Sequence, residues 1–230
     1  MPAPAAPFDA MPDHSTGPSP DTSSGNHGEV LVPTPTMDLT HHFLIAMPGL
    51  EDEMFARSVV YLCEHSQRGA LGLVINKPSD INLSNLFEKV ELPLMREDLR
   101  ETPVFHGGPV QTERGFVLHE ALYAAGDEAK PEESVFASTL AIPGGMEMTT
   151  SKDVLVALST GMGPRKVLIS LGYSAWGEGQ LESELAENSW LTVGADIAVI
   201  FDTPIEERYD RALKLLGLES WMVQPMAGRA

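Results

Sequence analysis

The sequence contains a single cysteine, Cys63, in 230 residues. An internal disulfide needs two cysteines and a cysteine-rich zinc site needs several, so the composition excludes both. Long apolar runs are missing as well, because no stretch reaches the roughly 18 residues that a membrane-spanning helix requires. These absences predict a soluble protein, which we expect in the cytoplasm and without a membrane partner.

Basic residues are also scarce. The chain has 15 Lys and Arg against 33 Asp and Glu, which gives a formal net charge of -18 at pH 7. Nucleic-acid binding draws most of its affinity from cationic side chains that neutralise phosphates, and the sequence shows no basic stripe or helix-turn-helix. The charge therefore disfavours direct binding to nucleic acid, and it works equally against docking on anionic lipid.

Lys and Arg are absent altogether from residues 1–38, which are rich in Pro, Ser and Thr. Such a composition buries too little apolar surface to offset chain entropy, so we predict a disordered acidic tail. The segment has neither the basic start and apolar core of a signal peptide nor the basic character of a transit peptide. The remainder is long enough for a single domain over residues 39–222, followed by a flexible C-terminal tail over residues 223–230.

The domain opens with apolar runs bounded by turn residues, which predict strands at residues 43–47, 58–63 and 70–76, with Pro78 ending the third. Further strands are predicted at residues 134–142, 167–171 and 196–201, after a polar loop at residues 123–133.

Helical spacing and capping residues predict helices at residues 83–90, 151–160 and 178–188. A last helix is expected after Thr203, with Glu206 completing a capping box and a core stripe that includes Leu216. Strands grouped early, with helices interspersed later, predict an α+β fold with a mixed sheet.

The stretch from Val104 to Glu120 is the centre of this prediction. Two short strands, residues 104–105 and 115–118, are expected to form a hairpin around Gly107, Gly108 and Pro109. A Gly-Gly pair adopts backbone angles that a Cβ forbids, and a proline then fixes its own φ. We therefore expect the main chain to come close to another strand or to a ligand here.

Four segments resemble the AlgH/YqgE family of bacterial proteins: FLIAMPGLEDEMFARSVVYLCEH, GALGLVINKP, VFHGGPVQTERGFVLH and LGYSAWGEGQLESELAENSWLTVGADIAVIFDTPIEERY. The resemblance implies an α+β fold with a bifurcated, partly barrel-like mixed sheet surrounded by helices. It also implies a non-enzymatic regulator of transcription without a cofactor, acting indirectly through contacts with a protein or a small molecule. One departure is Ala175, which stands where the family usually has glycine before Trp176.

Six residues form the candidate ligand or partner surface: Gly107, Gly108, Pro109, Tyr173, Trp176 and Gln180. Aromatic side chains that carry a polar atom are enriched at binding hot spots, which favours the segment from Tyr173 to Trp190. The alternative is that Tyr173, Trp176 and Trp190 pack in the core beside the helix at residues 178–188, which is the more frequent role of such residues. The partner is predicted to be a protein or a small molecule of unspecified identity.

Catalysis is the rival hypothesis. Cys63 with His65 and the other histidines suggests a thiol enzyme or hydrolase, although residues two apart on a continuing strand stand about 7 Å from each other. His106 and His119 suggest a metal site, but zinc needs a third protein ligand that no familiar spacing supplies. The nucleophile elbow and the dinucleotide fingerprint both fail. The sequence therefore assigns no catalytic residue, metal or cofactor.

Overall fold

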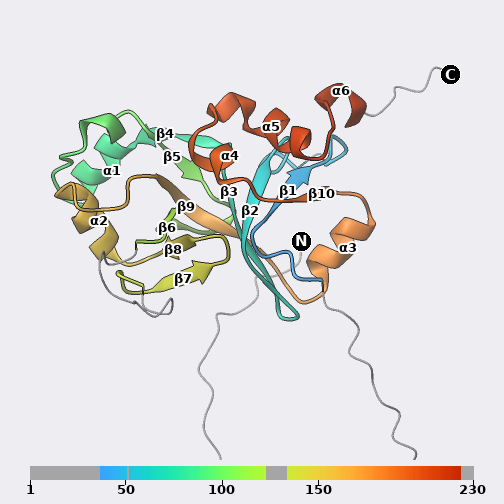
Figure 1. The fold of residues 1–230 in the computed structure, drawn as a ribbon, viewed down its shortest axis with the longest axis horizontal. Coiled ribbons are helices and arrows are strands. Elements are labelled where there is room, and N and C mark those ends of the chain that lie inside the picture. The colour runs from blue at the N-terminus through green and yellow to red at the C-terminus, as the bar shows by residue number, and fades with distance from the viewer. Residues whose placement is uncertain (1–36, 51, 123–133, 224–230) are drawn as a thin grey trace, which may run out of the picture. The chain divides into compact units, whose positions relative to one another are not determined.

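The computed structural model describes residues 37–50, 52–122 and 134–223 (Figure 1). The loop predicted at residues 123–133 lies outside these ranges, as do residues 1–36 and 224–230 of the two predicted tails. Within the described ranges no helix is both long and apolar enough to cross a membrane.

The strands are β1 (His42–Ala46), β2 (Val59–Ser66), β3 (Gly69–Val74), β4 (Pro78–Asn82), β5 (Pro103–His106), β6 (Val110–Glu120), β7 (Thr139–Ile142), β8 (Met146–Thr149), β9 (Val167–Trp176) and β10 (Trp190–Gly194). The α-helices are α1 (Leu83–Lys89), α2 (Lys152–Ser159), α3 (Gln180–Ala186), α4 (Ile197–Phe201), α5 (Arg208–Leu215) and α6 (Ser220–Val223). Short 3₁₀ turns occupy Glu97–Leu99 and Ile205–Glu207. The mixed α+β class is therefore confirmed.

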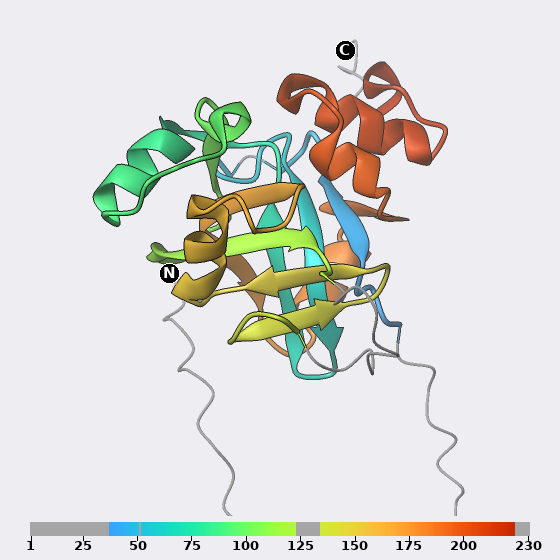
Figure 2. The same ribbon diagram turned by 60° about the vertical axis from the view of Figure 1, so that its left-hand side comes forward.

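The sheet runs in the order β10-β1-β2-β3-β9-β6-β8-β7 and forks at β9. The first half of β9 pairs in parallel with β5, and its second half pairs antiparallel with β3 along the same edge. Strand β6 follows the opposite edge of β9. The sheet curls on itself, so that the β7–β8 hairpin crosses in front of β2 and β3 in Figure 2. This forked, partly barrel-like sheet is the architecture that the resemblance implied.

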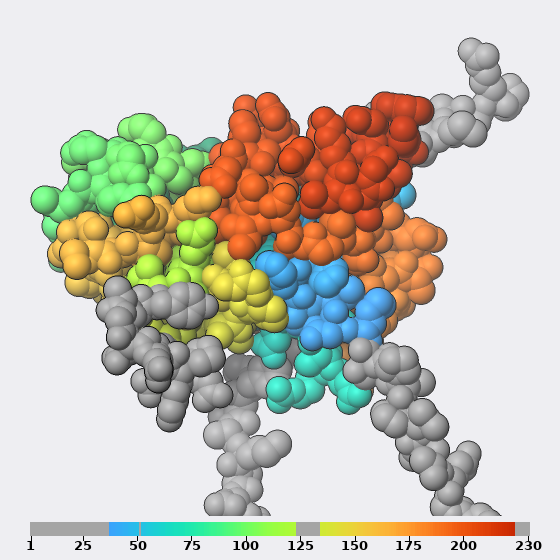
Figure 3. Space-filling view, viewed as in Figure 1, coloured from blue at the N-terminus to red at the C-terminus, as the bar shows by residue number. Residues whose placement is uncertain are grey.

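Among the described residues, three buried clusters hold the curled sheet and its helices together. The largest fills the inside of the curl and continues under α4 and α5, with Tyr61 and Phe116 among its members. A second lies between the outer face of β5, β6 and β9 and the helices α1 and α2. The third packs α3 on the outer face of β2 and β3. Helix α5 covers β1 and β2, and the C-terminal helices form a continuous block beside β1 in Figure 3.

The hairpin predicted around Gly107 is wrong, because β5 and β6 do not pair with each other. They lie on opposite edges of β9, and residues 107–109 carry the chain across that strand. At the crossing, a Cβ on Gly107 would stand 2.2 Å from the Gly172 carbonyl oxygen, and one on Gly108 would stand 2.3 Å from the Tyr173 carbonyl carbon. Gly108 also has a φ of 153°. The close backbone approach expected of the glycine pair is therefore present, and its partner is a strand.

The strand expected at residues 196–201 is also wrong. Residues 196–201 form helix α4 instead of a strand, because Asp196 Oδ1 accepts the Ala198 N–H at the helix start. The last strand is β10, which adds to β1 at the sheet edge. The third strand, β3, ends before Pro78 as expected, and Pro78 then begins β4 at the outer edge of β5, where a missing N–H is tolerated.

The predicted capping box before the last helix is also wrong. The Thr203 hydroxyl donates back to the Ala198 carbonyl, and a 3₁₀ turn precedes α5. In the apolar stripe of this helix, Tyr209, Ala212 and Leu213 are buried as expected, whereas Leu216 is exposed.

Candidate functional site

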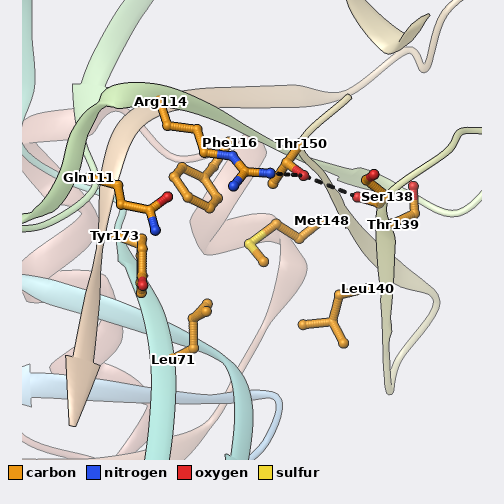
Figure 4. A pocket seen from close by; sticks show the side chains of 10 residues that line it. All are labelled: Leu71, Gln111, Arg114, Phe116, Ser138, Thr139, Leu140, Met148, Thr150 and Tyr173. Atoms are coloured by element: carbon orange, nitrogen blue, oxygen red, sulfur yellow. Dashed lines mark hydrogen bonds between the residues drawn. The ribbon is translucent and has the colours of Figure 1, made fainter. Parts of the chain in front are cut away.

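The inside of the curled sheet opens to solvent through a groove of about 370 Å³, which we call the barrel-mouth groove (Figure 4). Strands β3, β6, β7, β8 and β9 contribute to its walls. The residues that line it are Leu71, Gln111, Arg114, Phe116, Ser138, Thr139, Leu140, Met148, Thr150 and Tyr173.

The groove has an apolar floor and a polar rim. Residues two apart on a strand point to the same face, so one residue of such a pair can lie deep in the groove and the other nearer to solvent. The deep and shallow pairs are Phe116 with Arg114, Met148 with Thr150, and Leu140 with Ser138. Arg114 belongs to β6, whereas Ser138 and Thr150 lie one residue beyond the ends of β7 and β8.

Two aromatic rings make one wall of the floor. Phe116 from β6 and Tyr173 from β9 have ring centroids 5.2 Å apart and planes tilted by 55°. Leu71, Met148 and Leu140 complete the floor, as Figure 4 shows. Because these side chains also belong to or pack against the large inner cluster, the floor is continuous with the hydrophobic core.

Among the lining residues that the structure describes, Arg114 supplies the one cationic side chain. Its Nη2 donates to Thr150 Oγ1 at 2.9 Å, and its guanidinium carbon lies 5.9 Å from the centre of the Phe116 ring. The Thr150 hydroxyl in turn donates to the Ser138 carbonyl at 3.3 Å. Within the part of the chain that the structure describes, no carboxylate lies within 4.0 Å of the Arg114 nitrogens. The guanidinium is held over the groove without an anionic partner from the described residues.

The structure brings together only part of the predicted surface. Gly107 and Gly108 are buried at the crossing beside Tyr173, and Pro109 is exposed. Pro109 lines a separate hollow of about 580 Å³ with residues 52–55. Tyr173 faces the inside of the curl, whereas Trp176, three residues further along β9, belongs to the outer cluster under α3. The six residues therefore do not form one surface.

Trp176 and Gln180 take part in a packing arrangement around Glu184. The indole nitrogens of Trp176 and Trp190 both donate to Glu184 Oε2, at 2.9 and 2.8 Å. Gln180 Nε2 donates to Glu184 Oε1 at 2.9 Å, while its Oε1 accepts the Gly177 N–H. The two tryptophans are only 6% and 4% exposed. These contacts match the packing alternative for both tryptophans.

Cys63 and His65 do not meet as a nucleophile and its base. A β-bulge between Leu62 and Glu64 breaks the strand alternation, so Cys63 enters the inner cluster while His65 turns toward α3. His65 Nδ1 accepts the Leu39 N–H at 3.0 Å, and its Nε2 lies 3.0 Å from Glu182 Oε1. Cys63 is 1% exposed, and burial raises the pKa of its thiol. Burial thus disfavours the thiolate that a nucleophile requires.

The two histidines considered for a metal site are also apart. His106 is exposed at the end of β5, and His119 is buried on β6, across β9 from it. His119 Nδ1 donates to the Glu120 carbonyl at 2.9 Å and Nε2 accepts from the Thr149 hydroxyl at 3.0 Å. Burial lowers the pKa of this imidazole. Over residues 37–50, 52–122 and 134–223, no group of three or more His, Cys, Asp or Glu is placed to hold a metal ion.

Sequence reasoning missed most of the barrel-mouth groove. Of the lining residues it had singled out Tyr173 as part of a candidate surface. A signal was present in the spacing of two residues between Arg114 and Phe116 and between Met148 and Thr150. That signal shows which residues share a face of one strand, but the neighbours across the groove come from strands far away in the sequence.

Comparison with known proteins finds relatives whose own length this chain covers almost in full. It is 77% identical over 194 residues to a UPF0301 protein of Variovorax paradoxus. The match covers 84% of this chain and 96% of that protein. A UPF0301 protein of Paracidovorax citrulli is 72% identical over 206 residues, covering 84% and 97%.

Two solved structures are also similar to this chain. The solution structure of the AlgH protein from Pseudomonas aeruginosa matches with a TM-score of 0.66 and 46% identity, covering 86% of this chain and 98% of that one. A crystal structure of a Corynebacterium diphtheriae protein shares the fold with a TM-score of 0.59 at 20% identity, over 82% and 88% of the two chains. A family model described as AlgH-like matches residues 43–221. From residue 43 to residue 221, this chain belongs to the AlgH-like family.

Proposed function

We propose that this protein is a non-enzymatic cytoplasmic regulator that binds a small molecule in the barrel-mouth groove and acts on transcription indirectly, through protein contacts. The observation that carries the proposal is the groove itself, with its apolar floor and polar rim. Small-molecule sites are concave, mostly apolar and equipped with a few placed polar groups, and they recur in the mouths of β-barrels. A volume of about 370 Å³ lies within the range of roughly 300–1,000 Å³ for such sites.

The chemistry of the lining supports binding over catalysis. A nucleophile needs a base within hydrogen-bond reach, and the lining residues within the described ranges provide hydroxyl groups but no His, Asp, Glu, Cys or Lys. Cys63, the other candidate nucleophile, lies inside the core with its thiol favoured over the thiolate. A thiol enzyme would need the sheet to open before a substrate could reach this sulfur.

The charge of the chain supports an indirect role in regulation. A net charge of -18 opposes the approach of a DNA phosphate backbone. A regulator with this charge acts more readily by recognising another protein or a small molecule than by reading a duplex.

A pair of substitutions on the same strand tests the proposal. Leu140 lines the groove from β7, whereas its neighbour Ala141 is exposed on the opposite face. Leu140→Trp fills the groove, and Ala141→Trp adds the same ring outside it. Mixtures of small apolar and amphipathic molecules are screened by amide chemical shifts against the unmodified protein and both variants.

The expected result is a group of ligands that shifts signals around Phe116 and Tyr173. These ligands should bind the Ala141→Trp protein normally and the Leu140→Trp protein at least tenfold more weakly. Shifts that are absent at the groove, or that survive Leu140→Trp unchanged, contradict the proposal.

A further inference from the structure

We infer that the ligand of the barrel-mouth groove is a small amphipathic monocarboxylate, an apolar chain that ends in one carboxylate group, with Arg114 as the residue that binds the carboxylate. This inference rests on the proposed function and adds the chemical class of the ligand. It follows from the separation of apolar and cationic groups along the groove.

The apolar floor of the groove determines the chemistry of the apolar part of the ligand. Phe116 and Tyr173 contribute aromatic rings, and Leu71, Leu140 and Met148 add aliphatic and thioether groups (Figure 4). Apolar affinity scales with the area removed from water, so an unbranched chain of several methylenes gains from each one that reaches the floor. A ligand that is polar throughout would leave this floor without a partner.

The polar rim of the groove determines the chemistry of the charged part of the ligand. A guanidinium carries five N–H donors in a planar fork that matches a carboxylate, and the acceptor for Arg114 within the described chain is Thr150 Oγ1. The contact with Thr150 and the position over the Phe116 ring hold the guanidinium at the edge of the floor. Its remaining donors are therefore available to an anion whose chain lies below.

Neighbouring groups make the rim selective for one anionic group instead of several. The Gln111 amide lies between Arg114 and Tyr173 in Figure 4, and the Ser138 and Thr150 hydroxyls complete the rim. These groups are neutral, and among the described residues that line the groove Arg114 is the one cation. A diphosphate or a tricarboxylate would bring more negative charge than this rim neutralises.

The net charge of the chain affects how much the apolar chain and the carboxylate of the ligand each contribute to the affinity. Repulsion from distant carboxylates is screened beyond roughly 8 Å at physiological ionic strength, whereas contact with Arg114 acts at short range. We therefore expect the chain contacts to give most of the affinity, and Arg114 to give the preference for an anion over a neutral molecule of the same length.

Octanoate and 1-octanol are matched probes for this inference, since they share a chain and differ in charge. Binding to the full-length protein is measured by chemical-shift titration, and filtered nuclear Overhauser spectra locate the chain of the probe. Arg114→Gln removes the cation. Arg211→Gln, an exposed arginine on α5 outside the groove lining, makes the same charge change as a control.

We expect octanoate to bind about tenfold more tightly than octanol, the usual size of one charge-assisted contact. Its terminal methyl should show Overhauser contacts to the Phe116 and Tyr173 rings. Arg114→Gln should weaken octanoate about tenfold and octanol less than about threefold, while Arg211→Gln should leave both unchanged. Hexanoate should bind roughly tenfold more weakly than octanoate, because two methylenes are lost.

Failure of this inference is distinguishable from failure of the proposed function. If octanoate and octanol bind equally in the groove, or if Arg114→Gln and Arg211→Gln have equal effects, the carboxylate class is overturned while the groove remains a ligand site. If neither probe contacts the groove and the wider screen with Leu140→Trp is also negative, both are overturned.

Discussion

Adding a single methyl group at Gly107 should destabilise the whole sheet, while the same change at Gly115 should not. Gly107 lies where the chain crosses β9, and its ideal Cβ position is 2.2 Å from the Gly172 carbonyl oxygen and 2.7 Å from Ser170 Oγ. Gly115 belongs to the same stretch, eight residues later on β6, and a Cβ there meets no atom within 4 Å. Gly107→Ala and Gly115→Ala therefore form a matched pair.

The expected magnitude follows from the contacts at the crossing. Ordinary contact begins at about 3.4 Å, so residue 107 must move by about 1 Å away from β9. This shift strains two buried hydrogen bonds, from Gly107 N–H to the Leu171 carbonyl at 2.9 Å and from Val74 N–H to the Gly107 carbonyl at 3.0 Å. Overpacking costs about 1–3 kcal/mol and each of the two weakened hydrogen bonds about 1 kcal/mol, so we expect a loss of about 3–5 kcal/mol.

Gly115→Ala should change the free energy of unfolding in the opposite direction, or not at all. Its backbone angles suit alanine, and a glycine replaced at such a position gains roughly 0.4–1 kcal/mol from reduced freedom of the unfolded chain. Urea unfolding followed by circular dichroism, extrapolated linearly to water, gives both values. A Gly107→Ala protein within about 0.5 kcal/mol of the unmodified one would refute the tight crossing, because innocuous substitutions scatter over that range.

Three further predictions concern the aromatic cluster, pH and DNA. Glu184→Ala leaves the indole N–H groups of Trp176 and Trp190 without their acceptor, so urea unfolding should show a loss of about 2–4 kcal/mol, against about 1 kcal/mol for Glu184→Gln, which keeps one oxygen. Burial lowers the pKa of His119 and of His41, so the unfolded chain binds more protons and stability should fall as pH drops below about 6.5. His119→Gln should flatten this pH slope in urea titrations, and an unchanged slope would contradict it. Anisotropy titrations with duplex DNA at physiological salt should show no sequence-selective binding below micromolar concentrations, given the net charge of -18.

The sequence by itself determined the elements whose signals are local. The strands β1, β2 and β3 follow from apolar runs bounded by turn residues, and α2 and α3 follow from helical composition. The resemblance of four segments added the forked sheet and the family. The glycine pair also predicted a close approach of two backbones, because glycine is the residue type without a Cβ.

The tertiary structure alone decided how those elements pair. Residues 104–120 read as a hairpin because the two strands are close in sequence, yet each pairs with β9 some sixty residues later. The run that became α4 is too short and too apolar for its periodicity to separate a strand from a buried helix. Its conformation was settled by the cap at Asp196 and by packing under the sheet.

The candidate site shows the same division. Each strand carried its own alternation of apolar and polar residues, so the sequence determined which of them share a face. The groove arises where Leu71, Phe116, Leu140, Met148 and Tyr173 meet, from five strands spread over a hundred residues. Pairing between such distant strands depends on the curl of the whole sheet and on the bulge and glycines that direct it. No local pattern encodes that curl, so only the folded chain could bring Arg114 over an apolar floor.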